Sequence, residues 1–330
     1  MARLSDLQLL KTMRCTEILR EMICVFEKDL AKYRAGNRTD YCYQQIHTEQ
    51  YGNTDAHAEN RARLCYGLLF DKTLPEPERE QRIRELFAEE ITANENESFQ
   101  GISSGLQILS FLLLPYQKPE DEALFARAKH ANFDCACGYA PDLYEYSDDP
   151  ETYSPEDCAD IAAGTGLQEY LCELLDLVKA DAPDLDTCKH WQYYADMTNR
   201  AEDRAYFVQR IFDLTAQDKH ADDIERLLAY KKYILYLAEC GDAAGAYASF
   251  REGRQYLCSA NKTALYQTAK SIMLADAQYI PQVWQDIRSD TLRWLAKGTL
   301  YPVCWDIAAE CAEIAGDAVT AETIKNQKQS

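Results

Sequence analysis

Two pairs of a histidine and a carboxylate are the residues best suited to acid–base chemistry in this sequence. His47 is followed two residues later by Glu49, and His57 by Glu59, in a tyrosine-rich stretch. A histidine that acts as a general base needs a carboxylate that orients it. Residues i and i+2 of a helix point to different faces, so contact within either pair is not expected. A helical enzyme that uses His47 or His57 is therefore an alternative hypothesis rather than the main prediction.

Four residues near the middle of the chain have the types that bind zinc: His130, Cys135, Cys137 and Cys158. Zinc sites usually separate paired cysteines by two to four residues, whereas one residue separates Cys135 from Cys137. The other cysteine of the set is distant in sequence. We therefore expect no metal, no cofactor and no catalytic residue, and a metal-binding protein built on these four residues is a second alternative.

A strongly acidic window extends from His130 to Val178. It contains 12 Asp and Glu residues and no Lys or Arg. Within it, residues 134–155 hold three prolines and four tyrosines without helical periodicity, which predicts an irregular segment. Long segments of this kind inside a compact fold are often functional.

This segment combines tyrosine rings with carboxylates, which together can receive the Lys or Arg side chains of a partner. A solvated insertion between two helical hairpins is the simpler alternative. The predicted partner-binding residues are Tyr144, Glu145, Tyr146, Asp148, Asp149 and Glu151.

The composition indicates that helices position these residues. Only six of the 330 residues are Val, and Gly (13) and Pro (10) are scarce, whereas large sheets depend on β-branched residues. The net charge of −20 repels nucleic acid and anionic membrane surfaces and favours a basic partner. An acidic protein that imitates nucleic acid is a further alternative.

Local signals for the ends of helices divide the chain into hairpins. Ser154 precedes a proline and two acids, and Gly241-Asp242 and Gly316-Asp317 each place a stopping glycine before a capping aspartate. Residues 4–33 form one long amphipathic pattern behind Ser5. Hairpin tips are predicted near Gly36, Pro75, Gln117, Gly164, Arg200, Gly241, Tyr279 and Gly316.

Tips spaced by about 35 to 48 residues are typical of helix-pair repeats. The prediction is an all-α fold, an α-solenoid of about eight antiparallel hairpins that buries apolar faces by stacking neighbours. Residues 1–330 are expected to form one repeat domain. Its possible subdivisions are N-terminal hairpins at 1–133, an irregular acidic insertion at 134–155 and C-terminal hairpins at 156–330.

The C-terminal third resembles the tetratricopeptide-like (TPR-like) superfamily. Around Gly241, Tyr230 stands where that family has an opening aromatic residue, and Ala246 and Phe250 stand at its small and large packing positions. The resemblance implies stacked hairpins and a partner-binding scaffold. Its further matches are Trp305, Ala309 and Ala321 around Gly316, and Trp191 with Ala195; Lys325 departs from the family because it replaces a large apolar residue.

The 13 cysteines are odd in number and show no repeating spacing, which favours a reducing compartment. The first 20 residues lack the apolar core of a signal peptide, and the most apolar run, residues 108–114, is too short to span a bilayer. These features predict a cytoplasmic protein. The predicted function is a non-enzymatic scaffold that binds a protein or peptide on a concave helical surface, with a basic partner favoured by the acidic segment.

Overall fold

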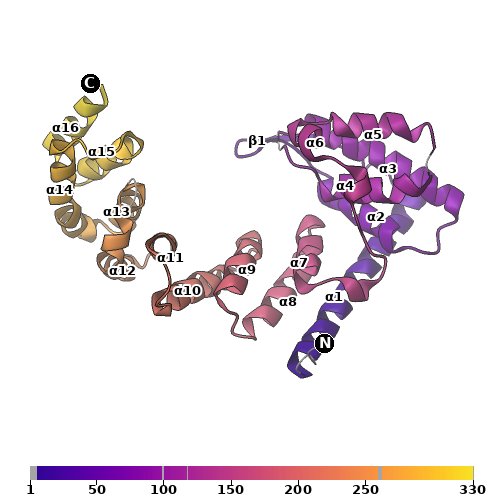
Figure 1. Cartoon of the computed structure of the whole chain (residues 1–330), viewed down its shortest axis with the longest axis horizontal. Helices are drawn as coiled ribbons and strands as arrows, with labels where there is room; N and C mark the ends of the chain where they lie inside the picture. The colour runs from indigo at the N-terminus through magenta and orange to yellow at the C-terminus, as the bar shows by residue number, and fades with distance from the viewer. Residues whose placement is uncertain (1–5, 99, 117, 259–261, 330) are drawn as a thin grey trace. The chain divides into compact units, whose positions relative to one another are not determined.

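A computed structural model describes residues 6–98, 100–116, 118–258 and 262–329. These residues form 16 α-helices, one β-hairpin and short 3-10 turns. The chain divides into two compact units, Met1–Val178 (unit 1) and Lys179–Ser330 (unit 2). Figure 1 shows the helices of unit 2 following one another in chain order, whereas in unit 1 α7 lies beside α1. The predicted all-α fold is confirmed in part, because the described residues are mostly α-helical.

Unit 1 is built around the long helix α1 and the buried helices α2 and α4. α1 packs against α2 and α7, and α2 packs against α3 and α4. Phe26 of α1 stacks on Tyr66 of α2 with ring centroids 5.7 Å apart. The helices are α1 (Asp6–Arg34), α2 (Ala58–Phe70), α3 (Glu76–Asn96), α4 (Ser104–Leu113), α5 (Asp121–Lys129), α6 (Phe133–Gly138), α7 (Pro155–Gly164) and α8 (Gln168–Lys179).

Between α1 and α2 the chain forms a β-hairpin, which corrects the all-α prediction. β1 (Gln45–Thr48) pairs antiparallel with β2 (Gly52–Asp55), and Thr48 lies opposite Gly52. Gly52 adopts φ +71° at the turn, a conformation that favours glycine. The tip predicted at Gly36 therefore leads into a hairpin of strands rather than into a second helix.

The segment predicted to be irregular starts with a short helix. Residues 133–138 form α6, capped by Asn132, whose side chain accepts from the backbone N–H of Cys135 at 2.8 Å. After α6 the chain has two 3-10 turns, η2 (Pro141–Leu143) and η3 (Pro150–Thr152). The prediction was wrong for residues 134–138 because a cap and one turn of helix are too short to produce periodicity.

Unit 2 consists of four consecutive helix pairs across its described residues. α11 packs against α12 and α13, and α13 packs against α14 and α15. Short 3-10 turns, η4 (Ala277–Tyr279) and η5 (Pro302–Cys304), precede α14 and α15. The pairs are α9 (Leu185–Met197) with α10 (Ala201–Gln217), α11 (Asp223–Glu239) with α12 (Ala243–Leu257), α13 (Thr263–Ala275) with α14 (Ile280–Ala296), and α15 (Trp305–Ile314) with α16 (Ala318–Gln329).

The predicted turn chemistry is present at the hairpin tips. Gly241 and Gly316 have φ +80° and +73°, and the aspartates that follow them cap α12 and α16. Ser154 and Asp157 form a reciprocal capping box at the start of α7. The tips at Pro75, Arg200 and Tyr279 also fall between α-helices, and Gly164 is the last residue of α7. Ser5 and Gln117 lie outside the described residues.

The positions that resemble the TPR-like family are packing positions in unit 2. Tyr230, Ala246 and Phe250 are buried between α11 and α12. Ala309 and Ala321 are buried between α15 and α16. Further positions of the resemblance lie in α9, where Trp191 and Ala195 are buried, and at the start of α15, where Trp305 is half-buried.

Lys325 does not occupy the large packing position of α16. Its ammonium pairs with Glu313 at the surface, while the preceding residue, Ile324, is fully buried. The large buried side chain in this turn of α16 is therefore that of Ile324, one residue before Lys325.

All 13 cysteines lie within the described residues and are free thiols. Across those residues, none of the helices has both the length and the apolar content that a membrane span requires.

Candidate functional site

The two tyrosines predicted to bind a partner, Tyr144 and Tyr146, pack against other residues of unit 1. Tyr146 packs edge-on against Phe111 of α4, with ring centroids 5.7 Å apart, and its hydroxyl donates to Gln107 Oε1 at 3.2 Å. Tyr144 packs against Tyr139 and accepts from the backbone N–H of Ala140 at 3.4 Å. Burial raises the pKa of both hydroxyls. Both rings are half-buried, so they anchor the segment as well as bordering its surface.

Two of the predicted acids pair with bases of unit 1. Asp148 lies 3.0 Å from Lys72, and Glu151 lies 3.1 Å from Arg20. All four side chains are more than half exposed, so these pairs contribute little to stability. These contacts place the acidic segment beside the middle of α1 and the end of α2, and its carboxylates stay in contact with water.

The other two acids lie at the surface of the same segment. Asp149 is exposed and caps η3, accepting from the backbone N–H of Glu151 at 3.0 Å. Glu145 is exposed between the two tyrosines. Of the six predicted residues, the four acids are therefore exposed and the two tyrosines are half-buried.

The histidines are oriented by neutral groups rather than by the nearby glutamates. His47 Nδ1 lies 3.0 Å from Asn53 Oδ1 across the β-hairpin. His57 Nδ1 lies 2.9 Å from the backbone oxygen of Cys42. The carboxylate of Glu59 lies beside Gly166, at the turn between α7 and α8. In these contacts the Nδ1 of each histidine meets a neutral oxygen rather than a carboxylate.

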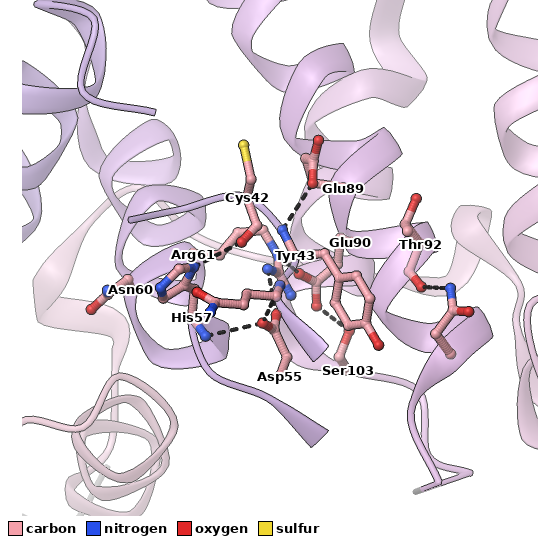
Figure 2. A network of polar contacts seen from close by, with 12 residues as sticks. Cys42, Tyr43, Asp55, His57, Asn60, Arg61, Glu89, Glu90, Thr92 and Ser103 are labelled. Carbon is pink, nitrogen blue, oxygen red and sulfur yellow. Dashed lines mark hydrogen bonds and ion pairs between the residues drawn. The ribbon is translucent and has the colours of Figure 1, made fainter. Parts of the chain in front are cut away.

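Figure 2 shows a buried network of charges beside His57. Arg61 of α2 is fully buried between two carboxylates: its Nη1 lies 2.6 Å from Asp55 Oδ2, and its Nε lies 2.5 Å from Glu90 Oε2. Glu90 also accepts from the hydroxyl of Ser103 at 2.6 Å. Asp55 accepts from the backbone N–H of His57 at 3.0 Å. The network joins the end of β2, helices α2 and α3, and the start of α4.

The charged groups of this network compensate one another in the buried environment. Burial opposes the charge of Arg61, but Glu90 and Asp55 together hold the pKa of its guanidinium above the usual value. A Cβ atom on Gly105 would lie 2.8 Å from the Glu90 carboxylate, so α4 approaches that group closely. The charged groups are occupied by one another, which suits a structural role in fixing the hairpin better than a role in binding a substrate.

Glu97, which ends α3, belongs to the same electrostatic environment. Burial, together with Glu90 and Asp55, raises the pKa of its carboxyl to about 7. This carboxyl therefore gains and loses a proton near neutral pH. Glu97 could not be identified from the sequence, because nothing in the neighbouring residues shows that two other carboxylates fold close to it.

The four residues considered for zinc lie in different settings. Cys158 is buried in α7 with its Sγ 4.0 Å from the backbone oxygen of Cys15 in α1, and burial raises its pKa to about 12. Cys135 is buried in α6, Cys137 is exposed, and His130 ends α5. Within the described part of the chain, no three His, Cys, Asp or Glu residues are grouped so as to hold a metal ion.

The partner-binding role of the acidic segment stays a prediction, and the Arg61 network is a buried polar feature that the sequence analysis did not identify. Comparisons with protein-family models, with curated proteins and with solved structures gave no match to this chain.

Proposed function

We propose that this chain is a non-enzymatic scaffold that binds a protein or peptide. Unit 2 would supply a TPR-like array of stacked hairpins, a short α-solenoid with a concave face. The acidic segment of unit 1 would attract a basic stretch of the partner. The single observation that carries the proposal is the uneven distribution of charge along the chain.

Most of the net negative charge belongs to unit 1. Residues 1–178 contain 33 acids and 17 bases, a net charge of −16, whereas residues 179–330 contain 22 acids and 18 bases, a net charge of −4. A concentrated field of one sign accelerates the approach of an oppositely charged partner. It raises the association rate more than the affinity, and salt screens it.

The repeat character of unit 2 is supported by ion pairs between equivalent helices of successive hairpins. Lys189 of α9 pairs with Glu225 of α11 at 3.2 Å, and these residues are 36 positions apart. Arg254 of α12 pairs with Asp290 of α14, also 36 positions apart. A recurrence of this length is typical of helix-pair repeats, which bind partners on extended surfaces.

A pair of labelled peptides tests the acidic segment. Binding of a fluorescein-labelled peptide of sequence KSLKSLKSLKSL is followed by fluorescence anisotropy, with ESLESLESLESL as its acidic counterpart. We expect the basic peptide alone to bind, and its Kd to rise at least about tenfold between about 50 and 300 mM NaCl, because salt screens the attraction.

Two variants distinguish the effect of the acidic segment from that of the overall charge of the chain. The triple variant Glu145→Gln, Asp148→Asn, Asp149→Asn should weaken binding. A matched variant, Glu202→Gln, Asp223→Asn, Glu322→Gln, removes three exposed acids of unit 2 and should bind nearly as the parent does. Equal binding of both peptides, or equal effects of both variants, would contradict the proposal.

A further inference from the structure

A pocket of about 210 Å³ lies in unit 2 between α9, α10 and α11. α11 packs directly against α13, and α13 against α15, but α9 and α11 make no comparable contact along their described lengths. The pocket occupies the space between them. It is lined by Lys189, Gln192, Val208, Ile211, Thr215, Glu225, Leu228, Ala229 and Lys232.

The charged residues at the rim of the pocket are balanced by one another. Lys189 pairs with Glu225 at 3.2 Å, and Lys232 lies 3.9 Å from Asp196. Seven residues separate the two pairs on each helix, or about 10 Å along the axis. Burial lowers the pKa of Lys232, as expected for an ammonium at the edge of an apolar space. Arg204 shares Asp196 with Lys232, at 3.5 Å, and also pairs with Glu239 at 2.9 Å. Three carboxylates therefore balance the three bases, and the space between the pairs has no excess charge for an anion to neutralise.

One polar group of the pocket has no partner. Gln192 is 5% exposed, and its Nε2 is buried without a hydrogen-bond acceptor among the described residues. A buried donor left without an acceptor costs about 1–3 kcal/mol. An occupant that supplies one acceptor oxygen would remove this cost.

The walls of the pocket are mainly aliphatic. Val208 and Ile211 come from α10, and Leu228 and Ala229 from α11. Leu228 is 57% exposed, so it borders the entrance and has apolar surface left to cover. Benzene enters an apolar cavity of about 150 Å³ in another protein, so this pocket has room for a side chain the size of Leu or Phe.

We infer that this pocket binds a leucine- or phenylalanine-sized side chain of a partner peptide, whose neighbouring backbone carbonyl accepts a hydrogen bond from Gln192. The apolar walls cover the side chain, the single unpaired donor receives the carbonyl, and the paired rim selects an uncharged segment. The peptide nature of the occupant rests on the proposed scaffold function. The pocket and its chemistry are independent of the acidic segment of unit 1.

The test uses three small probes with the full-length chain: N-acetyl-L-phenylalaninamide, N-acetyl-L-leucinamide and N-acetylglycinamide. Methyl NMR of Ile, Leu and Val follows Val208, Ile211 and Leu228 while each probe is added to about 50 mM. This concentration is high enough to detect a Kd in the millimolar range, as expected for weak ligands. We expect saturable shifts at these methyl groups with the first two probes and none with the glycinamide.

Variants then separate the hydrogen bond from the apolar contact. Gln192→Met keeps the volume and removes the donor, so the Kd of the phenylalaninamide should rise about fivefold, the equivalent of one hydrogen bond. Ala229→Phe fills the pocket and should abolish the shifts. Ala244→Phe, at an exposed position of α12, is the matched control and should leave them unchanged. If Ala229→Phe fails to fold, Ala229→Met provides the same test with a smaller side chain.

Three results would overturn the inference: no saturable shift with either amide, an unchanged Kd in Gln192→Met, or tighter binding of the free acid N-acetyl-L-phenylalanine, which would indicate an anion site. The charged-peptide experiment and this one fail separately. Loss of salt-dependent binding leaves the pocket titration unaffected, and a silent pocket leaves the acidic segment unaffected.

Discussion

Gly253 of α12 lies directly against the ring of Tyr230 of α11. A Cβ atom at Gly253 would lie 2.3 Å from Cδ1 of that ring, much closer than van der Waals contact. The hydroxyl of Tyr230 donates to Glu252 Oε1 at 2.9 Å, so the ring is fixed at its hydroxyl end as well as beside Gly253. The missing side chain at position 253 is what allows these two helices to approach.

Gly253→Ala should destabilise unit 2, although alanine is favoured over glycine in a helix by about 1 kcal/mol. Because the ring must move, we expect a net loss of about 1–3 kcal/mol, as for other overpacked cores. All four tryptophans lie in residues 179–330, so urea unfolding followed by tryptophan fluorescence reports on this unit.

The control for that variant is Gly164→Ala, whose stability is followed by far-UV circular dichroism because Gly164 belongs to unit 1. Gly164 ends α7, and a Cβ atom added there would have no neighbouring atom within 4 Å, so alanine should be neutral or slightly stabilising at this position. A Gly253→Ala protein as stable as the parent would show that the Tyr230 ring yields freely.

Substitution of Arg61 should lower the free energy of unfolding far more than substitution of a charged residue at the surface. Arg61→Met leaves Asp55 and Glu90 buried without their counter-ion, and breaking a buried pair in this way costs about 3–5 kcal/mol. Hydrogen exchange should show the largest loss of protection in residues 45–70, and far-UV circular dichroism should show an earlier transition for unit 1.

Arg20→Met is the matched comparison. Arg20 pairs with Glu151 at the surface, and loss of such a pair changes stability by less than about 1 kcal/mol. Similar losses in the two variants would mean that the buried network does not hold the hairpin.

The hairpin tips could be predicted because their signals are local. A glycine with positive φ followed by a capping aspartate, as at Gly241-Asp242, gives the same turn wherever the helices pack. The Arg61 network could not be predicted in this way. Its partner Glu90 lies 29 positions along the chain, and a sequence with many acids offers no means of choosing that one.

The acidic segment shows the same limit for single residues. Its position and charge were visible in the sequence, but the direction of Tyr146 was not, because a tyrosine beside acids can equally face a partner or pack against Phe111. Gln192 had no distinguishing signal at all, since on an apolar helix face it looks like an ordinary polar residue. Only the folded arrangement leaves the Nε2 of Gln192 without an acceptor among the described residues.

The burial of Ile324, next to the exposed Lys325, gives a direct test of how α16 packs. Ile324→Ala should cost about 2–5 kcal/mol, since it empties a buried position, and tryptophan fluorescence should report the loss. Lys325→Ala removes only an exposed pair with Glu313 and should change stability by less than about 1 kcal/mol. The opposite order would mean that Lys325, rather than Ile324, occupies the packing position.

Glu97 should make the stability of unit 1 fall as the pH rises toward neutrality. Its carboxyl has a pKa of about 7 in the folded chain, compared with about 4.3 in an unfolded one. Between these values the folded state holds a proton that the unfolded state has released, so each increase in pH favours unfolding. Glu97→Gln removes this dependence.

The free energy of unfolding of Glu97→Gln should therefore equal that of the parent near pH 4.5. At pH 7.5 it should be higher by about 1–2 kcal/mol, once the partial exposure of the Glu97 carboxyl is allowed for. Urea unfolding by circular dichroism at the two pH values measures this difference. Glu122→Gln, on the exposed face of α5, is the control and should follow the parent at both. If Glu97→Gln keeps the parent's slope between pH 4.5 and 7.5, the proton is bound elsewhere, and the proximity of Glu97 to Glu90 and Asp55 does not govern its ionisation.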